Sequence, residues 1–239
     1  MQFSQWKFSV LLVSMFVLLG IRVASEQLGW GRFPVQAGTV VLVVAMLHAL
    51  NTGKHARILG LVMAAPIMAL TVWTRIEPPG TEHITFILVR ACMTVFMGFA
   101  TIAIMQNLLV QRKITHDTLV GAFCGYLLIG AMWTELYCLV DLVSPMSFRT
   151  SVEIPEDEQV RRSPYDVRWI RMQYFSYVTL STLGYGDVLA VTPLTRLLAC
   201  LEAICGQFYL AVLVSGLVSI RISQTTGHSP DSSEKSSSA

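Results

Sequence analysis

Six apolar stretches alternate with short polar segments along the chain. They span residues 8–23, 35–50, 58–73, 84–110, 119–143 and 194–222. The hydrocarbon core of a bilayer is about 30 Å thick, so a helix needs about 20 mostly apolar residues to cross it, or fewer where flanking residues complete the span. The pattern therefore predicts six transmembrane helices.

Composition favours lipid as the solvent and excludes several function classes. Of the 239 residues, 54% are hydrophobic and only 13% are charged, whereas soluble domains carry about 25% charged residues. The net charge is +2 and no Lys/Arg run exceeds a pair, so we expect a bilayer and no nucleic acid as partner. All five cysteines lie inside apolar stretches, so neither a disulfide framework nor a resident metal or other cofactor is expected.

Basic residues in the short loops indicate the topology. Lysines and arginines of such loops prefer the cytoplasm, and those that share one side here are Lys7, Lys54, Arg57, Arg112 and Lys113. This bias predicts a multi-pass protein of the cell membrane with both termini cytoplasmic. One alternative is a cleaved secretory signal formed by the first stretch, although Arg22 lies unfavourably close to its cleavage site.

Three regions follow from this division. Residues 1–116 form a four-helix transmembrane region, and residues 117–222 hold the last two apolar stretches with a long polar connection between them. Residues 223–239 contain seven serines and few apolar side chains, a composition that predicts a disordered cytoplasmic tail.

The connection ends in a motif that suits a dehydrated cation. Residues 182–187 read Thr-Leu-Gly-Tyr-Gly-Asp. Carbonyl oxygens replace the water shell of such an ion when successive peptide units point at one axis, and Gly184 and Gly186 adopt the positive φ that this needs. We expect the K⁺ sites at Thr182, Leu183, Gly184 and Tyr185, with Gly186 completing the row.

The motif resembles the selectivity filter of potassium channels. Residues 192–214 are similar to the inner helix of small bacterial members, and residues 119–148 are similar to their outer helix. The resemblance covers about 119–222. It implies an all-α membrane protein with one re-entrant pore helix and filter between the fifth and sixth helices. Four identical chains would surround one axis and conduct K⁺ passively, without enzymatic chemistry.

The resemblance also suggests how the filter is supported. The side chains of Leu183 and Tyr185 would point into the protein and brace the strand against a pore helix over residues 171–181, whose aromatic side chains include Tyr174 and Phe175. We expect the Tyr174 hydroxyl to donate to the carboxylate of Asp187 at the outer end.

Further positions of the inner helix match the family. Gly206, 24 residues after Thr182, corresponds to the gating hinge, and close helix packing is the alternative reason for a glycine there. The face formed by Gln207, Leu210 and Val214 is expected to line the inner cavity.

The first four stretches lack the pattern of a voltage sensor. Stretch 84–110 holds Arg90 as its single basic residue, and one charge contributes only about 2.3 kcal/mol per 100 mV. Opening is therefore not expected to be strongly voltage dependent. Arg90 either pairs with Glu135 or Asp141 or reaches the outer interface, which we favour. Glu135 and Glu202 lie behind the filter, paired with the loop backbone or with Arg196, or are exposed near the outer interface.

Two other classes of function stay open. A regulatory subunit without conduction of its own would carry the same motifs. A polytopic transporter would need several such loops, and an enzyme would need a cluster of catalytic side chains. The chain has one such loop, and His48, His55, His83 and His116 are scattered along it.

Overall fold

The computed structural model describes residues 7–28, 32–49, 54–74, 82–110, 116–151 and 164–226. Each of the six apolar stretches forms a helix, and one more helix precedes the motif. The elements in chain order are α1 (Lys7–Leu28), α2 (Arg32–Ala49), α3 (Lys54–Trp73), α4 (Glu82–Val110), α5 (His116–Val143), β1 (Phe148–Thr150), α7 (Pro164–Leu180), β2 (Val188–Ala190) and α8 (Pro193–Thr226).

Four of these helices are apolar over a length that crosses a bilayer. The spans are Lys7–Ser25, Ile84–Leu108, Leu119–Val143 and Pro193–Leu213, and the apolar parts of α2 and α3 are shorter, Pro34–Ala49 and Ile58–Trp73. The chain is thus a mainly helical, multi-pass membrane protein. Because the two shorter helices need flanking residues to complete a span, the number of six crossings stays a prediction.

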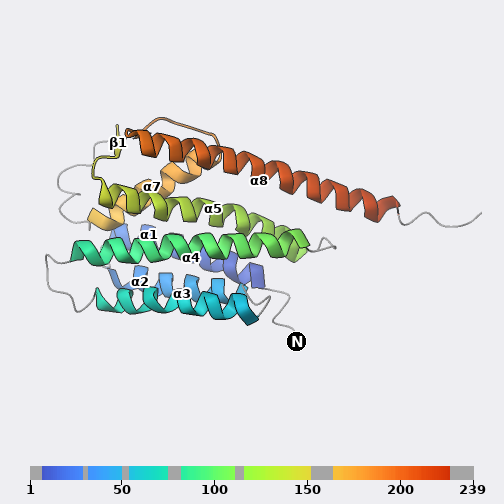
Figure 1. The fold of residues 1–239 in the computed structure, drawn as a ribbon, viewed down its shortest axis with the longest axis horizontal. Helices are drawn as coiled ribbons and strands as arrows, with labels where there is room; N and C mark the ends of the chain where they lie inside the picture. The colour runs from blue at the N-terminus through green and yellow to red at the C-terminus, as the bar shows by residue number, and fades with distance from the viewer. Residues whose placement is uncertain are drawn as a thin grey trace, which may run out of the picture.

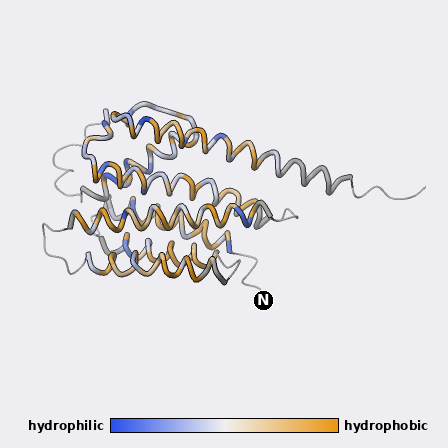
Figure 2. Tube along the Cα trace, in the orientation of Figure 1, coloured by the Kyte–Doolittle hydropathy of each residue, from blue (hydrophilic) through white to orange (hydrophobic). Residues whose placement is uncertain are grey.

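The helices α1 to α5 lie side by side, and α8 extends beyond them (Figure 1). Figure 2 shows hydrophobic residues along most of their length. Helix α5 occupies a central position, since it packs against α4, α1, α7 and α8. It therefore connects the first four helices with the elements that carry the motif.

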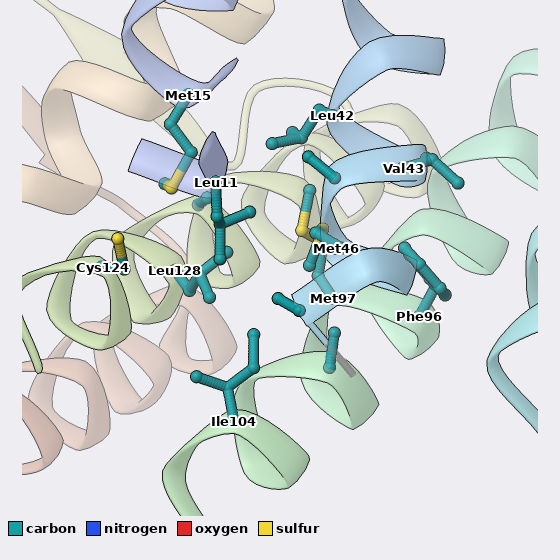
Figure 3. Close-up of a cluster of buried hydrophobic side chains, with 14 of the residues drawn as sticks. Leu11, Met15, Leu42, Val43, Met46, Phe96, Met97, Ile104, Cys124 and Leu128 are labelled. Atoms are coloured by element: carbon teal, nitrogen blue, oxygen red, sulfur yellow. The ribbon is translucent and has the colours of Figure 1, made fainter. Parts of the chain in front are cut away.

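A buried apolar cluster joins α1, α2, α4 and α5 (Figure 3). Leu11, Met46, Phe96, Ile104 and Leu128 are all buried in it. Helix α1 is an integral part of this core, which argues against its removal as a secretory signal.

A two-stranded antiparallel sheet departs from the all-α expectation. Strands β1 and β2 pair antiparallel, with Phe148 opposite Ala190 and Thr150 opposite Val188. Three residues are too few to show the alternation by which a strand is recognised in a sequence. The two strands connect the segment after α5 with the segment after the motif.

Two helix boundaries also differ from expectation. Helix α7 begins at Pro164, seven residues before the predicted pore helix, because proline is well suited to a first helical turn. Helix α8 continues to Thr226, so it includes the first four residues of the predicted tail. Residues 227–239 lie outside the described residues.

Candidate ion-conduction site

The motif begins where α7 ends, and its first amides complete that helix. Thr182 N–H donates to the Thr179 carbonyl oxygen at 2.9 Å, and Leu183 N–H and Gly184 N–H donate to the Val178 carbonyl oxygen at 2.9 and 3.3 Å. The last carbonyls of a helix have no partner within it. They anchor the motif here, and the chain then runs back toward the end of the molecule where β1 lies (Figure 1).

Backbone conformation alternates along the motif. The φ angles of Thr182, Gly184 and Gly186 are 58°, 58° and 79°, whereas Leu183 and Tyr185 are not among the residues with positive φ. Alternation in the sign of φ allows successive carbonyls to face the same side of the strand, as in an ion filter. The positive φ expected at both glycines is confirmed. Thr182 adopts it at a cost of about 1–2 kcal/mol, and such strain is typical of functional sites.

Five consecutive carbonyl oxygens of the motif lack a donor. Within the part of the chain that the structure describes, no N–H or hydroxyl group donates to the carbonyls of residues 182–186. The flanking carbonyls are both occupied, since Ser181 accepts from the Thr182 hydroxyl at 2.7 Å and Asp187 accepts from the Ser151 N–H at 2.8 Å. The motif therefore presents a bounded row of unpaired acceptors, which suits coordination of a dehydrated cation.

The outer end of the motif is held by side chains and by the pairing of β1 with β2. Asp187 Oδ1 accepts from the N–H of Val188 at 3.1 Å, and the Asp187 carbonyl accepts from the Ser151 hydroxyl at 3.2 Å. The hydrogen bond from the Tyr174 hydroxyl to the Asp187 carboxylate raises the pKa of Tyr174 to about 12. The structure thus brings Tyr174 and Asp187 together.

Comparison with known proteins assigns this part of the chain. The sequence model of a family described as "Ion channel" matches residues 142–221. "Two-pore potassium channel 5" of Arabidopsis thaliana is 42% identical over 45 residues, which cover 19% of this chain and 11% of that protein. "Inward rectifier potassium channel Kirbac3.1" of Paramagnetospirillum magnetotacticum is 42% identical over 53 residues, which cover 22% of this chain and 18% of that protein.

Residues 142–221 thus match an ion-channel family, and short segments of the chain are similar to two potassium channels. The chain spans less than a fifth of the length of either relative. No solved structure is significantly similar to it.

Two side chains of the motif are exposed in the single chain. Leu183 is 56% exposed and Tyr185 is 67% exposed, so the expectation that they point into the protein is wrong for the single chain. Phe175 is buried instead between Tyr137 and Phe148, with ring centroids 5.2 Å from each. The face of α7 that carries Phe175 is occupied by α5 and β1, which leaves the filter without aromatic support from that residue.

Gly206 lies where α8 passes the end of the pore helix. A β-carbon on Gly206 would overlap the backbone carbonyl oxygen of Leu180. Only glycine permits this approach between α8 and the last residue of α7. The packing alternative for Gly206 thus has a direct structural basis, and its role as a gating hinge stays a prediction.

The expected cavity face begins at the inner end of the filter. Gln207 is exposed in the single chain, and its amide Nε2 lies 3.4 Å from the Thr182 hydroxyl oxygen. Leu210 is also exposed. Val214 belongs to α8, but its side chain lies outside the described residues.

A buried ion pair corrects our expectation for Arg90. Its guanidinium Nη1 lies 2.7 Å from Glu135 Oε2, so the side chain does not reach for the outer interface. Trp169 Nε1–H of the pore helix donates to Glu135 Oε1 at 2.7 Å, and the guanidinium of Arg22 lies over the Trp169 ring, 3.6 Å from its centroid. Residues of α1, α4, α5 and α7 therefore meet in one polar cluster.

A second ion pair anchors the start of the pore helix. Asp141 Oδ2 of α5 lies 2.8 Å from Arg168 Nε and 3.7 Å from an Arg171 guanidinium nitrogen. Opposite charges within apolar stretches were a signal for the pair of Arg90 and Glu135, whereas Arg168 and Arg171 lie in the polar connection. The matching of both pairs required the packing of α5 against α4 and α7, which sequence spacing does not reveal.

Helix α7 also contacts a buried carboxyl group of α8. Glu202 of α8 is fully buried and bonds to Tyr137 and Ser176. It pairs with neither the loop backbone nor Arg196, whose Nε–H donates to the Ala190 carbonyl oxygen at 3.2 Å. Exposure of Glu135 and Glu202 near the outer interface is likewise excluded.

Proposed function

We propose that this chain is a subunit of a potassium-selective channel that conducts K⁺ passively. The observation that carries the proposal is the row of five unpaired carbonyls at residues 182–186, combined with the alternating φ of Thr182, Gly184 and Gly186. A dehydrated K⁺ needs oxygen ligands that point at one axis. The ions are the substrate, and the transport requires neither cofactor nor covalent chemistry.

Helix α7 contributes an electrostatic attraction at the inner end of the filter. Its last residue is Leu180, two residues before Thr182, and a helix C-terminus carries the negative end of the helix dipole. In the proposed arrangement α7 re-enters the membrane between α5 and α8 without crossing it. The dipole then stabilises a cation in the cavity bordered by Gln207 and Leu210.

A homotetramer would complete the site. One strand offers carbonyls on one side of the ion only, and four strands are needed to surround it. The apolar side chains of α8 that are exposed in the single chain include Leu197, Leu201, Ile204 and Phe208. These side chains, together with Tyr185 of the filter, supply an apolar surface for contact with neighbouring subunits.

The proposed topology has six crossings and both termini in the cytoplasm of the cell membrane. It rests on the basic residues of the short loops and on the presence of a helix in each apolar stretch. Single cysteines introduced into a cysteine-free variant would test it, because a membrane-impermeant thiol reagent added to intact cells should label only outward-facing positions.

Ion flux into liposomes tests the central proposal. The purified chain is reconstituted and the flux is measured with K⁺ or Na⁺ as the permeant cation, with protein-free liposomes as control. We expect K⁺ flux well above Na⁺ flux. Equal permeability would refute potassium selectivity, and flux that appears only with a co-reconstituted channel would favour a regulatory subunit.

A further inference from the structure

Glu202 of α8 contacts both α5 and α7, so it connects three helices. Its Oε2 lies 2.6 Å from the Tyr137 hydroxyl oxygen of α5, and its Oε1 lies 2.5 Å from the Ser176 hydroxyl oxygen of the pore helix α7. The residue is 0% exposed. A buried carboxyl group that bridges three helices is costly unless its charge is compensated or absent.

No compensating cation accompanies this carboxyl group. Among the described residues, no lysine, arginine or histidine forms an ion pair with Glu202. The titratable groups that face the site are phenols and a thiol: Tyr126 and Tyr137 from α5, Tyr177 from α7 and Cys200 from its own helix. The phenols are neutral near pH 7.

A count of the hydroxyl hydrogens in this cluster indicates the protonation state of the Glu202 carboxyl group. The cluster has four close oxygen–oxygen contacts: Tyr137 with Glu202, Ser176 with Glu202, Ser176 with the Gly130 carbonyl, and Thr134 with the Gly130 carbonyl. Tyr137, Ser176 and Thr134 supply one hydroxyl hydrogen each. Four contacts and three hydrogens leave one pair of oxygens facing each other without a hydrogen, unless Glu202 carries a proton.

We propose that Glu202 is a proton-binding site and, in its neutral form, a positioning residue for the pore helix. The protonated carboxyl group donates to Ser176, Ser176 donates to the Gly130 carbonyl, and every contact in the cluster then contains a hydrogen. Loss of the proton leaves a buried negative charge and two oxygens in repulsion at the Ser176 turn of α7.

The effect on ion flow rests on the proposed function. Ser176 lies in the same turn of α7 as Val178 and Thr179, whose carbonyls hold the amides of residues 182–184. A displacement of this turn moves those amides, and with them the inner end of the filter. Conduction should therefore fall as the pH rises through the titration of Glu202. The decrease should reach about tenfold per pH unit where most Glu202 is ionised, as expected for a single proton.

Infrared difference spectroscopy tests the proton site without reference to conduction. Wild-type protein in lipid should show the C=O stretch of a protonated carboxylic acid at neutral pH, and this band should be missing in Glu202→Gln. Ser176→Ala removes two of the four contacts. Each remaining contact already contains a hydroxyl hydrogen when Glu202 is ionised, so the band should disappear at a lower pH than in the wild type. Ser14→Ala is the matched control, because the Ser14 hydroxyl bonds only within its own helix.

Potassium flux against pH tests the positioning role. The wild-type flux should decline with rising pH, and the Glu202→Gln flux should be independent of pH, since the amide stays neutral. Absence of the infrared band overturns the proposal whether or not the protein conducts. An unchanged pH profile in Glu202→Gln overturns the positioning role. A wild-type protein that shows the band but no flux at any pH retains the proton site and instead refutes the proposed function.

Discussion

Arg90 of α4 and Glu135 of α5 form a buried ion pair, with 2.7 Å between Nη1 and Oε2. Glu135 also accepts from Trp169 of the pore helix at 2.7 Å. The pair therefore links the first four helices to α7, the helix that precedes the motif at residues 182–187. This link gives Arg90, the single basic residue of stretch 84–110, a structural role.

Removal of one partner should be far more harmful than removal of both. Glu135→Met leaves a buried guanidinium without its carboxylate and should cost about 3–5 kcal/mol in the free energy of unfolding. The double variant Arg90→Met/Glu135→Met should recover a large part of this loss. Denaturant unfolding of the two single variants and the double variant measures the coupling, and strictly additive losses would contradict a direct interaction.

Voltage should change the open fraction only weakly. Arg90 is the single basic residue of stretch 84–110, and each charge that crosses the membrane field contributes about 2.3 kcal/mol per 100 mV. Because Arg90 is held by Glu135, even this charge is not expected to move. Currents from the purified channel across a range of voltages check this, and a steep dependence on voltage would contradict it.

Tyr185→Asp should abolish selectivity and leave assembly intact. The substitution keeps the backbone carbonyl of residue 185 but replaces the ring proposed to pack against a neighbouring subunit with a short charged side chain that cannot hold the strand in place. The reversal potential under a K⁺/Na⁺ gradient should therefore shift toward zero. Val13→Ala, on the exposed face of α1, is the control. An unchanged reversal potential in Tyr185→Asp would mean that the filter lies elsewhere.

Gly206→Ala separates packing from bending in α8. A methyl group at residue 206 would overlap the Leu180 carbonyl oxygen, and overpacking of this kind costs about 1–3 kcal/mol. We expect a lower unfolding temperature and reduced potassium flux. Gly216→Ala is the matched control in the same helix, since no atom lies within 4 Å of its β-carbon position. Unchanged stability in Gly206→Ala with altered gating would favour the hinge instead.

The contact between Tyr174 and Asp187 should be lost at high pH. The hydrogen bond to Asp187 raises the pKa of Tyr174 from 10.0 to about 12. Its stabilising effect is thus complete below pH 10, where the phenol is protonated in both the folded and the unfolded chain, and it disappears as the pH approaches 12. Ultraviolet titration of the phenolate in wild type and Tyr174→Phe measures this, and a normal pKa for Tyr174 would contradict the contact.

The positions of the helices and of the filter followed from local patterns. Apolar stretches marked the helices because burial in lipid or in a helical bundle requires long runs of apolar residues. Gly184 and Gly186 marked the positive φ angles because glycine is the residue that adopts them most readily. Both signals act over a few neighbouring residues, so they can be read without knowledge of the fold.

Other features depended on which elements meet. The sequence does not predict the start of α7 at Pro164 or the three-residue strands β1 and β2, because their local patterns are weak. Phe175 was expected at the filter but packs between Tyr137 and Phe148, since that face of α7 meets α5. An aromatic side chain on a helix does not specify which neighbour will cover it.

Sequence alone established the membrane environment, the filter motif and the scarcity of charge in the fourth apolar stretch, because each of these is a property of consecutive residues. Tertiary packing was needed to pair Arg90 with Glu135, to enclose Glu202 between α5 and α7, and to bring Gly206 against Leu180. Those relationships join residues that are 26 to 65 positions apart. Their partners are selected by the way helices pack and not by the order of the chain.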